Sequence, residues 1–195
     1  MPRWDAQAEE RLRTAGLELF LELGYENVTV AQIAERAGLT RRTFSRYFTD
    51  KRDVLFAGSE RLPGLLADAL SQADPELPPF EALLGALADV GAMLGARVGS
   101  DAAQRRDVIA RSPELQERGR TKFAAVADAL ATELVLRGSD PSSATLLADV
   151  AVAIFRTGFG RWVDNPDDGD LAARLQEAGV ELADAVARFS AARPT

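Results

Sequence analysis

The stretch that most constrains this chain is residues 41–48, RRTFSRYF, which combines the pattern of a short helix with a strongly basic surface. Thr40 precedes it and is a good helix N-cap, and Gly38 indicates a tight turn just before. Phe44 and Phe48 are four residues apart, so one narrow face can be buried. The other side chains are basic or polar and suit phosphate oxygens and base edges. We therefore predict a helix that meets DNA.

A second short helix is predicted over residues 28–38, immediately before the first. Thr29 and Gln32 have the spacing of a capping box, and Gly38 can adopt the positive φ that ends a helix. Its apolar face consists of Ile33, Ala34 and Ala37. Helix, glycine turn and helix together predict a helix-turn-helix. The pattern alone leaves a second interpretation open, because any all-α domain contains short helices joined by glycine turns.

A longer series of positions extends this pattern. It runs Ile33-Ala34-x-x-Ala37-Gly38-Leu39-Thr40, then Thr43-Phe44-x-Arg46-Tyr47-Phe48, then Lys51. Over about residues 8–56 the chain resembles the DNA-binding domain of the tetracycline-repressor (TetR) family. The resemblance implies an all-α fold. Residues 1–50 would form a three-helix DNA-binding domain, and residues 51–195 a larger helical domain for effector binding and dimerisation.

Hydrophobic periodicity and the positions of Gly and Pro predict about nine helices and no strand. The predicted ranges are 5–23, 28–38, 41–48, 50–73, 80–98, 102–111, 112–137, 141–164 and 170–191. Asp50 is the predicted N-cap of the fourth helix, and Pro63-Gly64 is the point where that helix is expected to be disturbed.

The charge distribution agrees with a DNA-binding surface, although the formal net charge of the 195 residues is −7. Residues 36–52 contain six basic residues and one acidic residue. A local basic face on an acidic protein allows oriented docking on a polyanion. The alternative is an ordinary solvated charged face.

The sequence contains neither cysteine nor histidine, which excludes disulfides, thiolate metal sites and the usual general base. We expect no catalytic residues, no metal and no cofactor. An enzyme on a helical bundle is therefore disfavoured, and a helical protein–protein adaptor is the main alternative to a DNA-binding regulator. No signal peptide and no apolar run of membrane-spanning length is apparent, so the expected location is the cytoplasm, without a membrane partner.

Specific DNA contacts can be assigned to the two predicted helices. The hydroxyls of Thr29 and Thr40 are expected at phosphates, next to helix N-termini. The residues expected to reach base edges are Arg41, Arg42, Thr43 and Ser45. The resemblance implies that Arg46, Tyr47 and Lys51 hold phosphates. Arg42 replaces a glycine and Ser45 an aromatic residue that are common in the family, so the operator sequence cannot be transferred by analogy.

The remaining helices are expected to hold the subunit interface and a ligand pocket. The family implies a homodimer through residues 141–164 and 170–191, although these apolar helices can equally be buried within one chain. Candidate pocket residues, which can also be ordinary core, are Met93, Phe123, Phe155, Phe159 and Trp162. Arg156 lies in an otherwise apolar helix and is expected either to pair with Asp149 or Glu133 or to anchor an anionic ligand.

The function that the resemblance implies is a homodimeric transcriptional regulator, most typically a repressor. A small apolar or amphipathic effector would release it from a palindromic operator. The C-terminal half is weakly similar in texture to family members that respond to long-chain acyl-CoA thioesters.

Overall fold

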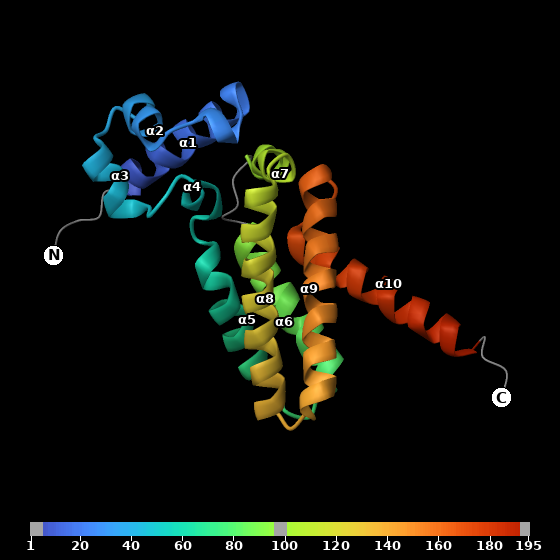
Figure 1. The fold of residues 1–195 in the computed structure, drawn as a ribbon. Coiled ribbons are helices and arrows are strands. Elements are labelled where there is room, and N and C mark those ends of the chain that lie inside the picture. The colour runs from blue at the N-terminus through green and yellow to red at the C-terminus, as the bar shows by residue number, and fades with distance from the viewer. Residues whose placement is uncertain (1–5, 96–100, 192–195) are drawn as a thin grey trace. The chain divides into compact units, whose positions relative to one another are not determined.

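The computed structural model describes residues 6–95 and 101–191, and within these ranges the chain forms ten α-helices, two 3₁₀-helices and no strand (Figure 1). The elements are α1 (Ala6–Leu23), η1 (Tyr25–Asn27), α2 (Val30–Arg36), α3 (Arg41–Tyr47), α4 (Asp53–Phe56), η2 (Ser59–Arg61), α5 (Leu62–Ser71), α6 (Pro79–Gly95), α7 (Ala102–Ala110), α8 (Pro113–Leu136), α9 (Pro141–Asp164) and α10 (Leu171–Ala191). The predicted all-α fold is confirmed.

The chain divides into two compact units that are not contiguous in sequence. The head unit contains the residues up to Glu60 together with α7 and the start of α8 through Arg120. The helical unit contains α5, α6, the rest of α8, α9 and α10. The compact head unit therefore extends beyond residue 50 and includes a later segment of the chain. The functional division at residue 50 stays a prediction.

The core of the head unit is formed where α1 packs against α2, α4 and α7. Its fully buried side chains include Leu12, Ile33, Phe44 and Leu115. Gly16 allows α1 to approach α4 closely, because a Cβ at this position would lie 2.6 Å from Cγ1 of Val54. This packing holds α2 and α3 on a rigid support.

The helical unit is built around α10, which packs against both α6 and α9. Glycines allow the close approach. A Cβ on Gly158 of α9 would lie 2.9 Å from Cα of Leu175, and one on Gly91 of α6 would lie 3.1 Å from Cα of Ala172. Leu175 is fully buried between them. The first half of α10 therefore belongs to the core of its own chain.

The predicted helix over residues 50–73 is wrong in its continuity. α4 ends at Phe56, and Gly58 follows with φ +79°, a conformation that L side chains rarely adopt. Pro63 does not break a helix. It lies in the first turn of α5, where the missing N–H has no intrahelical partner to lose. In the predicted helix 80–98, residues 96–98 lie outside the described ranges.

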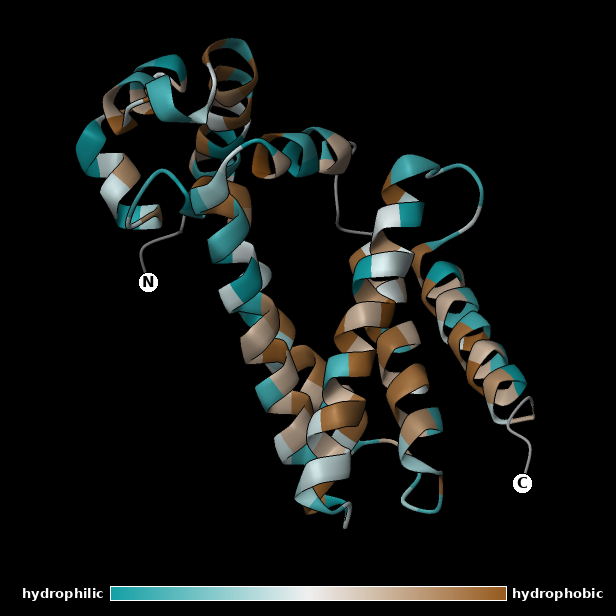
Figure 2. Cartoon of the chain, turned by 45° about the vertical axis from the view of Figure 1, so that its right-hand side comes forward, coloured by the Kyte–Doolittle hydropathy of each residue, from teal (hydrophilic) through white to brown (hydrophobic). Residues whose placement is uncertain are grey.

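One helix, α9, is long and apolar enough to cross a membrane by length and composition, with a mean hydropathy of 1.2 over its most apolar window. The expectation that the sequence holds no apolar run of membrane-spanning length is therefore corrected, on length and composition alone. A core helix passes the same test, and α9 contributes Ala151, Ile154 and Phe155 to the buried core. Figure 2 shows hydrophobic residues along the helices of this unit, continuing down the helix that leads to the C-terminus.

Candidate DNA-binding interface

The turn between α2 and α3 is defined by capping interactions that the sequence predicted. The Thr29 hydroxyl accepts a hydrogen bond from the Gln32 backbone N–H at 3.3 Å, and the Thr29 N–H donates to Oε1 of Gln32 at 2.8 Å. At the other end of α2, Gly38 has φ +65°. The Leu39 N–H donates to the Ala34 carbonyl at 2.8 Å, which closes a Schellman motif. The capping box and the glycine stop are both confirmed.

The recognition candidate, α3, is anchored by its two phenylalanines. Phe44 and Phe48 are 1% and 5% exposed, with ring centroids 5.4 Å apart. Thr40 caps the helix by accepting from the Thr43 N–H at 3.1 Å. At roughly 100° per residue, Arg42 and Arg46 lie about 160° from Phe44 on either side of the opposite face. Both are exposed, so burying the phenylalanines turns these arginines outward.

The arginines of α3 lack the carboxylate partners that surface arginines usually have. Within the described ranges, no ion pair joins Arg41, Arg42 or Arg46 to an acid. Arg46 lies over the ring of Tyr47, with Cζ 5.5 Å from its centroid. Two of these charges stand in the first turn, where the helix dipole disfavours cations. The face therefore has unbalanced positive charge.

The other basic residues of 36–52 are bound within the head unit, so the free basic surface is smaller than their number suggests. Arg36 binds Glu22 through two hydrogen bonds of 2.7 and 2.9 Å, and this contact lowers the pKa of Glu22. Arg52 pairs with Asp50 and, at 3.2 Å, with Glu114 at the start of α8.

Lys51 has a different environment from the one predicted. Its ammonium donates to the carbonyls of Tyr25 and Val28 at 2.7 and 3.0 Å, with that of Glu26 at 3.5 Å, and it lies 4.2 Å from the centroid of the Tyr25 ring. An ammonium has three N–H donors, and all three point to backbone carbonyls. This geometry does not support the predicted phosphate contact of Lys51. It indicates that Lys51 fixes η1 beneath the turn.

A reciprocal pair of carboxylates sets the entry to α4. Oδ1 of Asp50 accepts from the N–H groups of Arg52 and Asp53 at 2.8 and 3.3 Å, and Oδ2 of Asp53 accepts from the N–H groups of Thr49 and Asp50 at 3.1 and 3.3 Å. The side-chain hydrogen bond from Arg52, opposed by partial burial, lowers the pKa of Asp50. The helix itself begins at Asp53, so the predicted N-cap Asp50 acts three residues ahead of it.

Sequence reasoning missed Arg11, which supports the turn from α1. Its guanidinium donates to the Ala37 carbonyl at the C-terminal end of α2. A Cβ on Gly38 would lie 2.8 Å from Nη2 of Arg11, so the glycine also makes room for this contact. Nothing local in the sequence indicates a contact between residues 26 positions apart.

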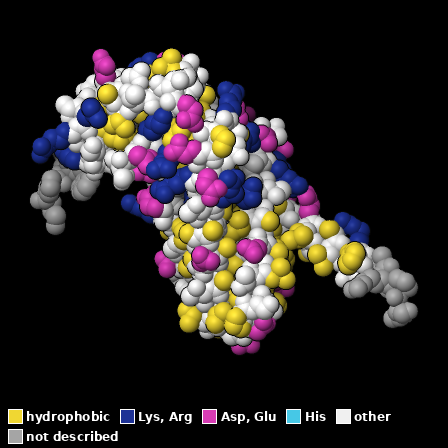
Figure 3. Space-filling view, viewed as in Figure 1, with side chains coloured by type: hydrophobic (Ala, Val, Ile, Leu, Met, Phe, Trp, Pro, Cys, Tyr) yellow, Lys and Arg dark blue, Asp and Glu magenta, His cyan; other side chains and the backbone are white. Residues whose placement is uncertain are grey.

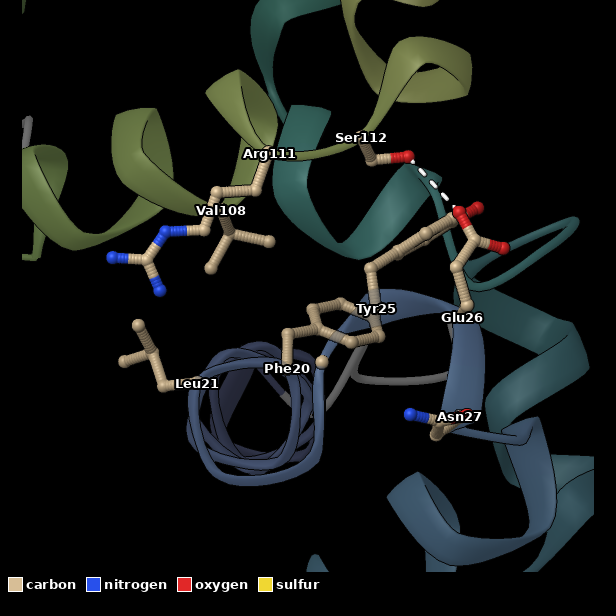
Figure 4. A pocket seen from close by; sticks show the side chains of 9 residues that line it. Phe20, Leu21, Tyr25, Glu26, Asn27, Val108, Arg111 and Ser112 are labelled. Carbon is tan, nitrogen blue, oxygen red and sulfur yellow. Dashed lines mark hydrogen bonds between the residues drawn. The ribbon is translucent and has the colours of Figure 1, made fainter.

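A small cavity of about 280 Å³ lies in the head unit between the end of α1 and the α7–α8 junction (Figure 4). Ser112, which is 3% exposed, donates to Oε1 of Glu26 at 3.2 Å, and Tyr25 lies beside Glu26. The Arg111 side chain extends away from this bond, toward Val108 and Leu21. Burial, with the nearby Glu114 carboxylate, raises the pKa of Tyr25. The start of α8 is therefore an integral part of the head unit.

The predicted pocket residues separate into two groups in the helical unit. The aromatic row is Phe123, Phe155, Phe159 and Trp162, with successive ring centroids 6.1, 5.9 and 5.9 Å apart. Met93 instead lines a groove formed by α5 and α6.

Arg156 is exposed, and its Cζ lies 5.9 Å from the centroid of the Phe123 ring. In the described part of the chain it forms no ion pair with Asp149 or Glu133, so the predicted pairing is wrong. The expectation assumed that Arg156 is buried, whereas it lies on the solvated side of α9.

Comparisons with known proteins agree with this architecture. Residues 12–57 match the family model described as bacterial regulatory proteins, tetR family, and residues 77–187 match the MftR C-terminal domain. The transcriptional regulator BetI of Escherichia coli O45:K1 (strain S88) is 36% identical over 107 residues, which cover 54% of this chain and 55% of BetI. TcmR of Streptomyces glaucescens is 35% identical over 80 residues, 41% of this chain and 35% of TcmR.

These alignments span about half or less of the curated relatives' length. Among solved structures, a triclosan complex of SmeT, the repressor of a multidrug efflux pump in Stenotrophomonas maltophilia, has a TM-score of 0.58 at 20% identity. The superposition covers 90% of both chains and establishes the fold. The MftR-type model alone spans more than half of the sequence. The chain therefore belongs to the tetR family of bacterial regulatory proteins.

Proposed function

We propose that this chain is a homodimeric DNA-binding transcriptional regulator, most typically a repressor, that reads a palindromic operator through α3. The supporting observation is the exposed, unbalanced positive charge of Arg41, Arg42 and Arg46 on a helix anchored by Phe44. Like charges four residues apart, as in Arg42 and Arg46, cost a helix about 0.2–0.5 kcal/mol. Phosphate groups along a DNA groove would attract both arginines and so offset the repulsion between them.

Contact roles follow from where each side chain lies. Arg42 and Arg46 lie on the outer face of α3. They are proposed to contact base edges in the major groove or the phosphates that border it. Thr29 and Thr40 stand at the N-termini of α2 and α3 and are proposed to face phosphates. The remaining proposed contacts are Arg41, Thr43, Ser45 and Tyr47. Lys51 is left out because its donors are used by backbone carbonyls.

A palindromic operator requires two heads, and α9 and α10 are the proposed dimer interface. They expose large apolar side chains in the single chain: Leu146 is 65% exposed, and Val180 and Val186 are 56% exposed. Burial of such side chains in a four-helix contact with a second copy would remove them from water.

The effector is proposed to be a small apolar or amphipathic molecule that binds beside the aromatic row of the helical unit. By linkage, a molecule that releases the operator must bind the DNA-free form more tightly than the DNA-bound form. We infer a regulator rather than an enzyme, acting in the cytoplasm where its DNA is.

Selection of bound sequences from random double-stranded DNA tests this function. The wild-type chain is expected to enrich an inverted repeat, because each copy of α3 reads one half-site. An R42A/R46A double variant should enrich no common sequence, whereas R120A, at an exposed position on α8, should enrich the wild-type repeat. Absence of any enriched motif with the wild-type chain would contradict the proposal.

A further inference from the structure

The helical unit contains a second candidate binding site, a groove formed by α5, α6 and the segment between them, with a volume of about 660 Å³. Its lining is mainly apolar and includes Leu65, Leu77, Ala86, Val90 and Met93. Leu77 is 39% exposed at its edge. Pockets of a few hundred cubic ångströms that are mostly apolar with a few polar groups are typical of small-molecule sites.

The polar groups of this groove carry negative charge. Asp68 of α5 and Asp89 of α6 both line it, and within the described residues neither carboxylate has an ion-pair partner. The whole segment from Leu62 to Gly95 contains five acidic residues and no lysine, arginine or histidine. On the face shown in Figure 3, lysine and arginine gather on the head unit, while the helical unit shows mainly hydrophobic and acidic side chains apart from the end of α10.

Arg137 at the end of α8 lies near one end of the groove but does not neutralise it. Its guanidinium donates to the carbonyls of Leu70, Ala73 and Asp74 at 3.1, 2.9 and 2.8 Å. Leu70 lies in the last turn of α5, and Ala73 and Asp74 follow that helix, so Arg137 ties the end of α5 and the segment after it to the end of α8.

Gly85 supports the idea that the groove is kept open. It lies in the middle of α6, lines the groove, and a Cβ built there meets no atom within 4 Å. Glycine is among the least favourable residues inside a helix, so alanine would be preferred for helix stability alone. Among the residues that the structure describes, no neighbour of Gly85 requires the missing side chain, in contrast to the neighbours of Gly91 and Gly158.

We propose that this groove binds a small amphipathic cation, with an apolar body on the Leu, Val and Met side chains and one protonated amine or quaternary ammonium between Asp68 and Asp89. An apolar floor excludes water from the ligand body, and two carboxylates attract a cation and repel an anion of the same shape. The site is distinct from the DNA contacts and goes beyond the proposed function.

Isothermal titration of the full chain, without DNA, tests the proposal. The probe is decyltrimethylammonium below its micelle concentration, and decanoate, with a chain of equal length and opposite charge, is the matched ligand. We expect saturable binding of one cation per chain and at least about tenfold weaker binding of decanoate. D68N/D89N should weaken cation binding by about tenfold or more. G85L, which fills the groove without a clash at Cβ, should abolish it.

The control is D128N/D149N, which removes two exposed carboxylates elsewhere on the helical unit and should leave binding unchanged. Circular dichroism melting checks that each variant is folded. Equal binding of cation and anion, no loss in D68N/D89N, or no saturable binding at all would overturn the proposal. Because DNA is absent, each of these outcomes is independent of whether the chain reads an operator.

Discussion

Arg42 and Arg46 lie four residues apart on one face of α3, yet their loss should have different effects on DNA binding. R46A should weaken binding to every sequence and lower the slope of log affinity against log salt by about 0.9, as expected for one lost phosphate contact. R42A should instead relax preference at one base pair, by about 1–3 kcal/mol. Titrations against an operator and single-base variants at several salt concentrations measure both. An unchanged slope in R46A, or a uniform loss in R42A, would refute the respective role.

Lys51 provides a second test at the scale of single residues. A structural role predicts that its loss lowers the stability of the fold, whereas a DNA contact predicts that its loss lowers the salt slope of DNA binding. K51M removes the ammonium donor of the Tyr25 and Val28 carbonyls, of which the Tyr25 carbonyl keeps the Val28 N–H at 3.3 Å. Leaving a buried polar group unpaired costs about 1–3 kcal/mol, and these part-buried carbonyls should cost less. The urea midpoint should therefore fall, whereas R120M, at an exposed position on α8, should leave it unchanged. A lower salt slope with unchanged stability would restore the phosphate contact.

These residues also show which contacts of the candidate site can be predicted from the sequence and which cannot. The caps at Thr29, Thr40 and Gly38 follow from local propensity, and each contact lies within a few residues. The partners of Lys51 lie 23 to 26 residues earlier, and Arg11 reaches Ala37 across 26 residues. Such contacts depend on how α1, η1 and α2 pack. No local pattern specifies them.

At the scale of elements, the entry to α4 depends on an ionised Asp50. Its pKa is lowered from 3.8 by the hydrogen bond from Arg52, so the folded chain holds the ionised form more strongly than the unfolded chain does. The resulting stability is complete above the unfolded pKa and is lost as the pH falls through the lower folded pKa. D50N removes this contribution. Urea midpoints from pH 6 to about 2.5 should show the wild-type advantage shrinking below about pH 4.

A difference in urea midpoint between wild type and D50N that stays constant with pH would contradict this account of α4.

The same region shows why the sequence predicts one helix over residues 50–73. The hydrophobic periodicity of residues 50–73 continues across the break, and Pro63 is the residue in this range that the sequence most clearly marks as a helix breaker. Gly58, with its positive φ, is the residue that separates α4 from the elements after it.

At the scale of the whole molecule, the sequence predicted an all-α chain with a helix-turn-helix, but not the composition of its units. The head unit includes α7 and the start of α8, which return from residues 101–120 to bury Val108 and Leu115 in its core. Their apolar residues look like those of any amphipathic helix. Which core they enter is decided by long-range packing.

The dimer makes a prediction at this scale. Val180 is 56% exposed in the single chain, so V180E should leave the monomer folded and place a charge in the proposed α9–α10 contact. Sedimentation velocity should find a dimer for the wild type and a larger monomer fraction for V180E. V135E, at a valine of α8 that is 42% exposed, is the matched control and should remain dimeric. Equal association states for all three would place the interface elsewhere.

The central claim is that this chain is a sequence-specific DNA-binding regulator, and one titration tests it most directly. Fluorescence anisotropy would compare the intergenic DNA beside its own gene with a scrambled duplex at about 0.15 M salt, where specific sites are typically bound about 10³-fold or more tightly than non-specific DNA. We predict a preference of at least that size, reduced in the R42A/R46A variant. Equal binding of both duplexes, together with no sequence enriched from random DNA, would contradict the claim.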